Sequence, residues 1–233
     1  MTAPVSVQYK ELDLDQIAEA PGHVVVVVGS DRSLGQAGRR VNRQTKGALE
    51  RAVASEAFGK LDKGEVLTLA FPLGMAAEAV HVLKLDKDCA PAEARAAGAA
   101  LALVKKGKPM LILAIGRGWP GEIGFGLALR TYRFDARKSK PSTEVEGPVT
   151  VMVSKPEAVA ANAKRHAALV EGVFFTRDLV KEPANVLTAP EFADRLVALR
   201  EIGLEVEVLD EPALEKLGMR LLLSVGQGSV TPS

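Results

Sequence analysis

The sequence has one cysteine, Cys89, and only 4% aromatic residues among its 233 positions. A single cysteine excludes an intrachain disulfide and favours a reducing compartment. The scarcity of aromatic rings means that a core must be built mainly from valine, leucine, isoleucine and alanine. No stretch reaches the roughly 18 uninterrupted apolar residues of a membrane-spanning helix, and the N-terminal residues lack a signal-peptide pattern. We therefore expect a soluble, cytoplasmic protein without membrane contact.

The chain also lacks an excess of charge of either sign. Thirty basic residues oppose 29 acidic ones, which gives a formal net charge of +1. A balance this close offers no general attraction to nucleic acid or to an anionic membrane. Any such partner would have to be bound by a local cluster.

Short apolar runs alternate with helical patterns over residues 1–154. Strands are predicted at 23–30, 65–71, 79–85, 109–115 and 149–154, and helices at 36–55, 91–108 and 123–132. The short spacing between the second and third strands is typical of a hairpin. We predict an α/β fold with a mixed, mostly parallel sheet and helices on both faces.

One long helical pattern follows, from Pro156 to Lys181, and it is long enough to connect two domains. Beyond it we predict a helix from 189 to about 202, a strand at 204–210, a short helix, and a second strand in "LLLSVGQGS". Two strands cannot make a stable sheet alone, so this second α/β unit is predicted to be incomplete. The domains are then 1–154, an interdomain helix at 155–182, and the start of a second domain at 183–233.

The three histidines give no metal-binding pattern. His23 and His81 lie at or in predicted strands and are interpreted as packed or edge residues, while His166 is assigned to a solvated face of the long helix. None belongs to an HExxH motif. Asp86 and Asp88 form a D-x-D without a supporting acidic cluster. Cys89 has no partner histidine in view, so a small buried residue is the favoured interpretation.

Two segments could hold phosphate groups. The glycine-containing turn "GSDRSLGQAGRR" at 29–40 follows a strand and precedes a helix, but it lacks both the G-x-G-x-x-G and the P-loop spacing. A basic cluster with Tyr132 and Phe134 interleaved could contact nucleic acid; it consists of Arg130, Arg133, Arg137, Lys138 and Lys140. A plain strand-to-helix turn and a solvated loop are the favoured interpretations of the two segments.

The segment "RDLVKEPANVLTAPEF" at 177–192 contains the most distinctive residues of the chain. Pro183 should end the long helix, and Asn185 suits a turn. Thr188 and Glu191 have the spacing of a capping box at the start of the next helix, with Pro190 in its first turn. Each of these residues has a conformational role, and none needs a catalytic one.

Three quoted stretches together resemble a known family. The blocks "RDLVKEPANVLTAPEFADRL" and "GLEVEVLDEPALEKLGMRLLLSVGQGS", with "LRTYRFDARKSK" upstream, are similar to the leucyl aminopeptidases, the cytosol aminopeptidase family. The likeness covers the interdomain junction and the first segment of the catalytic domain. Ala189, Arg220 and Lys181 depart from the usual family pattern, which affects local geometry only.

The resemblance implies a two-domain peptidase that releases N-terminal amino acids from peptides by two-metal hydrolysis. It also implies two divalent cations (manganese, zinc or magnesium), a cytoplasmic homohexamer, and DNA binding in some bacterial members. The family's metal-ligand motifs have no counterpart in these 233 residues, so we assign no catalytic, metal or cofactor-binding residue. We expect the chain to bind no metal and to be inactive alone. The alternatives are a non-enzymatic nucleotide- or DNA-binding module and an oligomer-assembly module.

Overall fold

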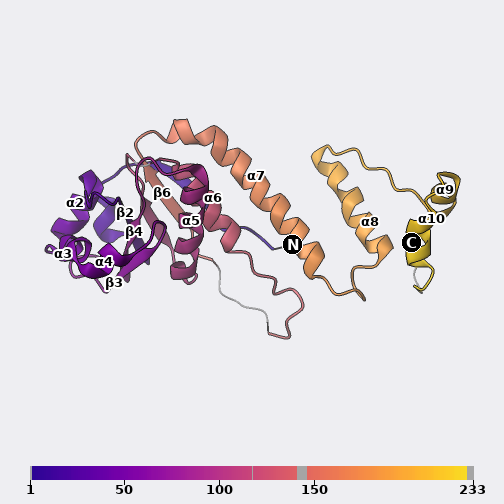
Figure 1. Cartoon of the computed structure of the whole chain (residues 1–233), viewed down its shortest axis with the longest axis horizontal. Helices are drawn as coiled ribbons and strands as arrows, with labels where there is room; N and C mark the ends of the chain where they lie inside the picture. The colour runs from indigo at the N-terminus through magenta and orange to yellow at the C-terminus, as the bar shows by residue number, and fades with distance from the viewer. Residues whose placement is uncertain (1, 117, 141–145, 230–233) are drawn as a thin grey trace. The chain divides into compact units, whose positions relative to one another are not determined.

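The computed structural model describes residues 2–116, 118–140 and 146–229. They form two compact units, Met1–Phe175 and Thr176–Ser233 (Figure 1). The predicted surface loop at 133–148 is described except for residues 141–145, which lie outside the described part of the chain. Residues 146–148 run beside the start of β5, where the Gly147 N–H donates to the Gly107 carbonyl at 2.8 Å.

The described part of the first unit contains a six-stranded sheet in the order β1-β6-β5-β2-β4-β3. Neighbouring strands are parallel except β3, which runs antiparallel to β4 as the hairpin spacing predicts. The strands are β1 (Val7–Glu11), β2 (His23–Val28), β3 (Val66–Ala70), β4 (Ala79–Lys84), β5 (Met110–Leu113) and β6 (Val149–Val153). The mixed, mostly parallel sheet is thus confirmed.

The sheet is buried on both faces, and its central strands are apolar at most positions, with His23 in β2 and His81 and Lys84 in β4 as the polar residues. All residues of β2 and β5 are buried. Alternate side chains of β2 enter opposite cores, with Val25 and Val27 in one and Val24, Val26 and Val28 in the other. Helices α2 to α4 and helices α5 and α6 lie on opposite sides of the sheet (Figure 1).

The helices of the first unit are α1 (Gln16–Glu19), α2 (Gly35–Gln44), α3 (Ala48–Ala54), α4 (Glu56–Lys60), α5 (Pro91–Lys105) and α6 (Pro120–Arg130), followed by α7 (Pro156–Lys181). Helices α5, α6 and α7 lie close to the predicted ranges, whereas α1 and α4 have no predicted counterpart. The single helix predicted at 36–55 is wrong, because Lys46 and Gly47 have positive φ angles of 50° and 80°. A left-handed pair ends one helix and starts another.

Strand β1 was not predicted, although its signal is present. Val5, Val7 and Tyr9 alternate with polar residues, which is the period of a strand with one buried face. Strand β1 pairs with β6 at one edge of the described sheet, and its residues Gln8, Lys10 and Glu11 are exposed. The run therefore lacks the continuous apolar character of the central strands.

Helices α5 and α6 approach each other unusually closely through two glycines. A Cβ atom added to Gly98 would lie 2.0 Å from the Ile123 carbonyl oxygen, and one added to Gly126 would lie 1.9 Å from the Arg95 carbonyl oxygen. The distance between packed helices depends on the side chains at the contact. Glycine at these two positions lets the backbones touch.

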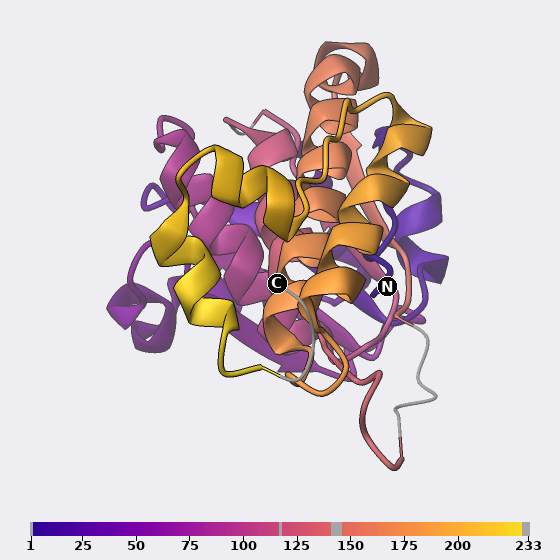
Figure 2. The same cartoon turned by 90° about the vertical axis from the view of Figure 1, so that its right-hand side faces the viewer.

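The long helix α7 is confirmed as one helix of 26 residues that ends at Lys181, before Pro183. The elements of the second unit follow it and are drawn in orange to yellow in Figure 2: α8 (Ala189–Val197), the 3-10 helix η1 (Ala198–Ile202), α9 (Glu211–Lys216) and α10 (Arg220–Gly226). The helix predicted from 189 to about 202 and the short helix after it are confirmed.

Both strands predicted in the second unit are wrong. Residues 204–210 form no strand, and the "LLLSVG" run forms α10. An isolated extended segment has no neighbour to satisfy its backbone N–H and C=O groups, whereas a helix bonds internally. Short apolar runs are ambiguous between strand and helix on periodicity alone, and the described residues of the second unit contain no strand with which either run could pair.

Candidate functional site

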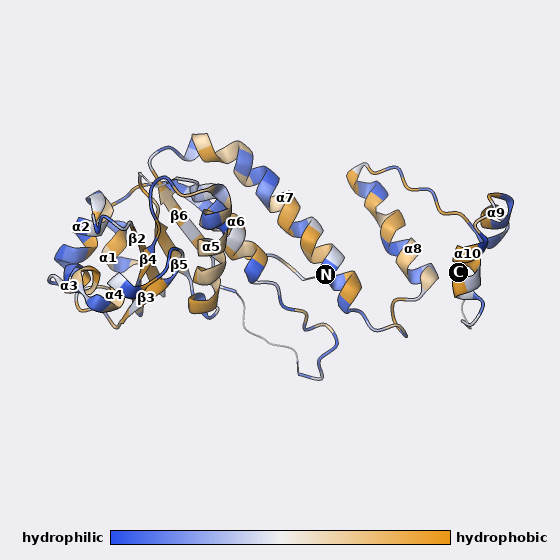
Figure 3. Cartoon of the chain, viewed as in Figure 1, coloured by the Kyte–Doolittle hydropathy of each residue, from blue (hydrophilic) through white to orange (hydrophobic). Residues whose placement is uncertain are grey.

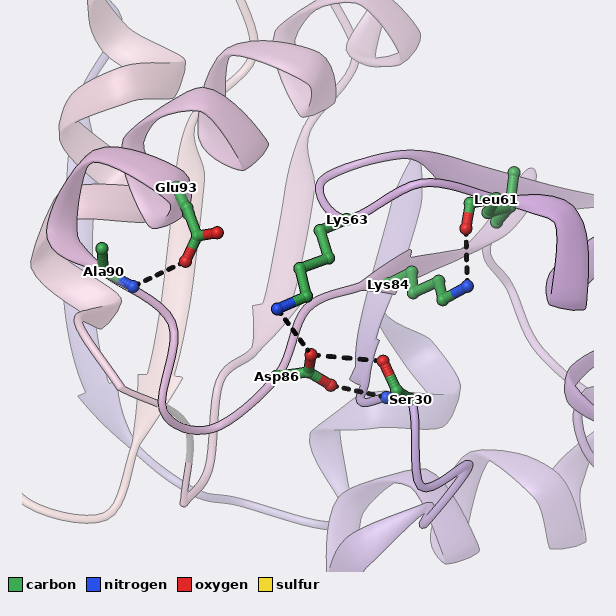
Figure 4. A network of polar contacts seen from close by, with 7 residues as sticks. All are labelled: Ser30, Leu61, Lys63, Lys84, Asp86, Ala90 and Glu93. Atoms are coloured by element: carbon green, nitrogen blue, oxygen red, sulfur yellow. Dashed lines mark hydrogen bonds and ion pairs between the residues drawn. The ribbon is translucent and has the colours of Figure 1, made fainter.

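The carboxyl ends of β2 and β4 bring together two of the predicted candidates. Asp86, which follows β4, accepts a hydrogen bond from the Ser30 backbone N–H at 2.6 Å and one from the Ser30 hydroxyl at 3.2 Å (Figure 4). The Lys63 ammonium lies 3.2 Å from the same carboxylate. Hydrogen bonding from the Ser30 N–H, the largest cause, and the nearby Lys63 hold the pKa of Asp86 below its usual value.

This network changes the interpretation of the glycine-containing turn at 29–40. An anion-binding turn offers free backbone N–H groups, but here the carboxylate of Asp86 occupies the Ser30 N–H. The Arg32 N–H donates to the Gly29 carbonyl at 2.9 Å, and the Ser33 N–H donates to the Asp31 carboxylate at 3.1 Å. The turn therefore uses these N–H groups internally, beside a negative charge that opposes phosphate.

The remaining polar contacts at this edge of the sheet have local structural roles. Glu93 accepts from the Ala90 N–H at 2.7 Å and so caps the start of α5, and the Lys84 ammonium donates to the Leu61 carbonyl (Figure 4). Cys89 is buried as predicted, and burial raises the pKa of its thiol. Within the described residues, no three histidine, cysteine, aspartate or glutamate side chains are placed to hold a metal ion.

His166 does not lie on a solvated face, so that prediction is wrong. Its imidazole stacks on the Phe125 ring, with centroids 4.4 Å apart, and its Nε2 lies 3.4 Å from a Glu122 carboxylate oxygen. The spacing of α7 alone could not show this, because the residues that receive the imidazole belong to α6. His23 and His81, in contrast, are buried as expected.

Glu122 is the centre of a polar cluster that links α5, α6 and α7. The Arg95 guanidinium donates to Glu122 at 2.8 Å and lies 5.1 Å from the centre of the Phe125 ring. Beside the cluster is a cavity of about 270 Å³, bounded by Tyr9, Phe125 and His166 among others. Burial, with Glu122 adding, raises the pKa of Tyr9 to about 12. A phenol held neutral in this way is no general base near neutral pH.

The basic cluster does not offer the aromatic surface that would favour nucleic acid. Tyr132 and Phe134 pack into the core of the first unit, and the Tyr132 ring meets Phe174 edge to face at 5.0 Å. Bases stack on exposed aromatic rings, and these two are turned inward. Lys138 pairs with Asp135.

The junction after α7 begins a helix as predicted but without the predicted capping box. Thr188 is the N-cap of α8, and its side chain makes no capping hydrogen bond. Glu191 instead pairs with Arg195 at 2.7 Å, four residues later, and Arg195 also lies 3.4 Å from Glu182. An arginine one turn away therefore takes the carboxylate from the backbone N–H of Thr188.

Comparison with known proteins decides the relationship. Residues 174–233 match the family model described as "Cytosol aminopeptidase family, catalytic domain". The whole chain is 55% identical to a probable cytosol aminopeptidase of Cereibacter sphaeroides and 53% identical to one of Dinoroseobacter shibae. The chain belongs to the cytosol aminopeptidase family. It spans about half the length of these curated relatives, 47% and 48% respectively.

A solved structure has a fold similar to that of this chain. The bottromycin maturation enzyme BotP matches with a TM-score of 0.64 and 25% sequence identity, over 91% of this chain and 44% of BotP. A second structure of BotP, in complex with Mn, matches with a TM-score of 0.63. Among the described residues, no helix is long and apolar enough to cross a membrane.

Proposed function

We propose that this chain is the N-terminal portion of a metal-dependent leucyl aminopeptidase, which releases N-terminal amino acids from peptides. The observation that carries the proposal is 55% identity over the whole chain to a relative named as a probable cytosol aminopeptidase. The match of 174–233 to the catalytic-domain model supports it independently. At such identity, both the fold and the placement of the junction are expected to be shared with that relative.

The proposed domain assignment follows the three predicted segments. Residues 1–154 form an N-terminal α/β domain without catalytic groups, 155–182 form the interdomain helix, and 183–233 begin the catalytic domain. Support comes from the exposed large apolar side chains of the second unit; Figure 3 colours part of α10 as hydrophobic. These side chains include Ile202, Leu204, Val208, Leu217, Leu221, Leu222 and Val225. Exposed apolar surface of this extent marks a place where further protein packs, and the remainder of a catalytic domain would cover it.

The described residues do not fit the two divalent cations that the proposed reaction needs. A two-metal hydrolytic site requires several carboxylates that converge on two ions about 4 Å apart, and no three potential ligands converge in the described ranges. We therefore propose that the metal ligands lie in a segment that corresponds to the part of the relatives' sequences that this chain does not span. Manganese, zinc and magnesium are the candidates, and a cytoplasmic homohexamer is the proposed assembly.

The test compares residues 1–233 with the whole protein encoded with them. Both are stripped with a chelator, and release of p-nitroaniline from Leu-p-nitroanilide is followed with and without Mn²⁺, Zn²⁺ or Mg²⁺. N-acetyl-Leu-p-nitroanilide is the matched substrate control, because an exopeptidase of this kind needs a free amino group. We expect activity only in the whole protein, with metal, on the unblocked substrate.

Two outcomes would contradict the proposal, and they differ. Turnover by residues 1–233 that rises with bound metal would refute the placement of the ligands outside this chain. A whole protein that binds metal but cleaves no unblocked peptide in a panel of N-terminal residues would refute the aminopeptidase assignment.

A further inference from the structure

Two histidines from neighbouring strands meet in the interior of the first unit. His23 begins β2 and His81 lies in β4, two residues beyond the register partner of His23. Their rings meet edge to face, with centroids 4.7 Å apart and an angle of 77°. His23 is 8% exposed and His81 only 2%. Two imidazoles are thus held together in a region that water barely reaches.

The hydrogen bonds around this histidine pair suit neutral rings. His81 Nδ1 lies 2.9 Å from the hydroxyl of Thr68, which is its register partner on the edge strand β3. His23 Nδ1 and His81 Nε2 are both buried without a hydrogen-bond partner among the described residues. A charged imidazole has two N–H donors, and leaving one of them unpaired in the interior is unfavourable.

The charged groups around the pair do not supply a free carboxylate. Glu78, before β4, pairs with Lys108 at 2.8 Å, and Glu146 pairs with the buried Lys105 at 2.7 Å. Lys106, at the end of α5, adds a further positive charge near both rings. With the two carboxylates already paired, three lysines surround the histidine pair.

Burial and the lysine charges act in the same direction, and Glu78 opposes them at His23. Burial lowers the pKa of His23, with Glu78 opposing and Lys108, Lys105 and Lys106 adding. Burial, then His23 and Lys106, lowers the pKa of His81 from 6.5 to about 4. The proton affinity of His81 in the folded protein is therefore roughly 300-fold weaker than in an unfolded chain.

We propose that the His23–His81 pair is an acid-sensitive latch that holds the edge strand β3 and its hairpin partner β4 against β2 while both rings are neutral, and releases β3 when they are protonated. The first proton falls on His23, because the charge of His23 is itself one cause of the lowered pKa of His81. A second proton on His81 places two like charges at ring contact, and the Thr68 hydroxyl accommodates it only in part, by turning to accept from Nδ1–H. Strand β3 yields first because β4 is its only partner within the described sheet.

The direction of the pH effect follows from the lowered pKa values. The stability that the neutral pair supplies is complete above the unfolded pKa of about 6.5. It falls as the pH drops from 6.5 towards 4, because the unfolded chain binds protons that the folded chain does not. Below about pH 4 the folded protein also takes up the proton, and the loss levels off.

The first experiment follows the imidazole C–H signals of the 233-residue chain by NMR from pH 7.5 to 4, with amide hydrogen exchange at each pH. We expect His81 to stay neutral until about pH 4. The protection factors of the β3 amides, which correct for the pH dependence of the intrinsic exchange rates, should be at least tenfold lower at pH 4.5 than at pH 7. The central strand β5 is the internal control and should keep its protection. His81 and His23 titrating together near pH 6.5 in the folded protein would overturn the proposal, as would equal loss of protection in β3 and β5.

The second experiment uses His81→Phe, which keeps an aromatic ring but cannot be protonated, with Gly172→Ala as the control that changes no titratable group and meets open space. Urea midpoints at pH 7 and pH 4.5 are compared for each variant. We expect the difference between the two pH values to shrink in His81→Phe and to remain as in the wild type in Gly172→Ala. An undiminished acid loss in His81→Phe would refute the latch; if this variant does not fold, the wild-type titration and exchange data decide alone.

Discussion

Replacing Gly98 with alanine is expected to destabilise the first unit, although alanine is the better helix former. The added Cβ would lie 2.0 Å from the Ile123 carbonyl oxygen, whereas Cβ atoms in proteins stay at least 3.0 Å from other heavy atoms. Helices α5 and α6 must therefore separate by about 1.0 Å at this point, the difference between the two distances. The clash is with backbone, so no side chain can rotate to relieve it.

The size of the effect follows from two opposing contributions. Overpacking of a core costs about 1–3 kcal/mol and occasionally more. A gap of 0.5–1 Å along the rest of the helix contact also removes about a quarter to a half of the dispersion attraction of each atom pair across it. The gain in helix propensity offsets roughly 1 kcal/mol of this. For on the order of 20 atom pairs the lost dispersion adds about 1 kcal/mol, so we expect a net loss of about 1–3 kcal/mol, or a decrease in Tm of roughly 2–12 °C.

The assay is urea unfolding followed by far-UV circular dichroism, supported by calorimetry. Gly172→Ala in α7 is the matched control, because no heavy atom lies within 4 Å of its added Cβ; it should stabilise by about 0.5–1 kcal/mol. Gly126→Ala should behave like Gly98→Ala. Wild-type stability in Gly98→Ala, or an equal loss in Gly172→Ala, would refute the idea that backbone contact between α5 and α6 requires glycine.

Two further predictions concern single polar contacts. Glu146→Gln leaves the ammonium of Lys105 buried without its counter-charge, and we expect the free energy of unfolding in urea at pH 7 to fall by about 3–5 kcal/mol. The double variant Lys105→Met with Glu146→Gln should recover most of this loss. A double variant no more stable than Glu146→Gln would contradict this account. Thr188→Ala should leave the amide exchange of the first turn of α8 unchanged, because the Thr188 hydroxyl makes no capping hydrogen bond. Asp210→Ala should destabilise α9 by about 1 kcal/mol, because the Asp210 carboxylate accepts from the Ala213 N–H at 3.0 Å. Equal exchange effects in the two variants would show that the difference in capping is not real.

The strands that the sequence predicts correctly are those whose local pattern agrees with their environment. The continuous valine run of β2 and the apolar run of β5 are buried on both faces, so burial and β-propensity favour the same structure. The division between α2 and α3 was not predicted because the apolar spacing continues across it, while Lys46 and Gly47, both with positive φ, reverse the backbone. The strand predicted at residues 204–210 is wrong for the opposite reason. The residues alternate as in a strand, but no strand lies beside them within the described residues.

The polar clusters were harder to predict because each joins residues that are distant along the chain. Ser30 and Asp86 are separated by 56 positions, and neither residue type shows in isolation that one caps the other. His166 was placed on a solvated face because nothing in α7 reveals the ring of Phe125 on α6. The Thr188 capping box failed because Arg195, one turn further on, competes for the same carboxylate.

The contact between Asp86 and Ser30 also sets a concentration threshold that any soluble anion must exceed to bind the Ser30 N–H. The carboxylate is tethered beside the turn by its own strand, so it acts as an intramolecular ligand whose effective concentration is on the order of millimolar or higher. A free phosphate or nucleotide would have to exceed that concentration, or bind correspondingly tighter, before it displaced the carboxylate from the Ser30 N–H. The Ser30 N–H in the turn at 29–40 is thus bonded to a carboxylate of the same chain, which dialysis cannot remove.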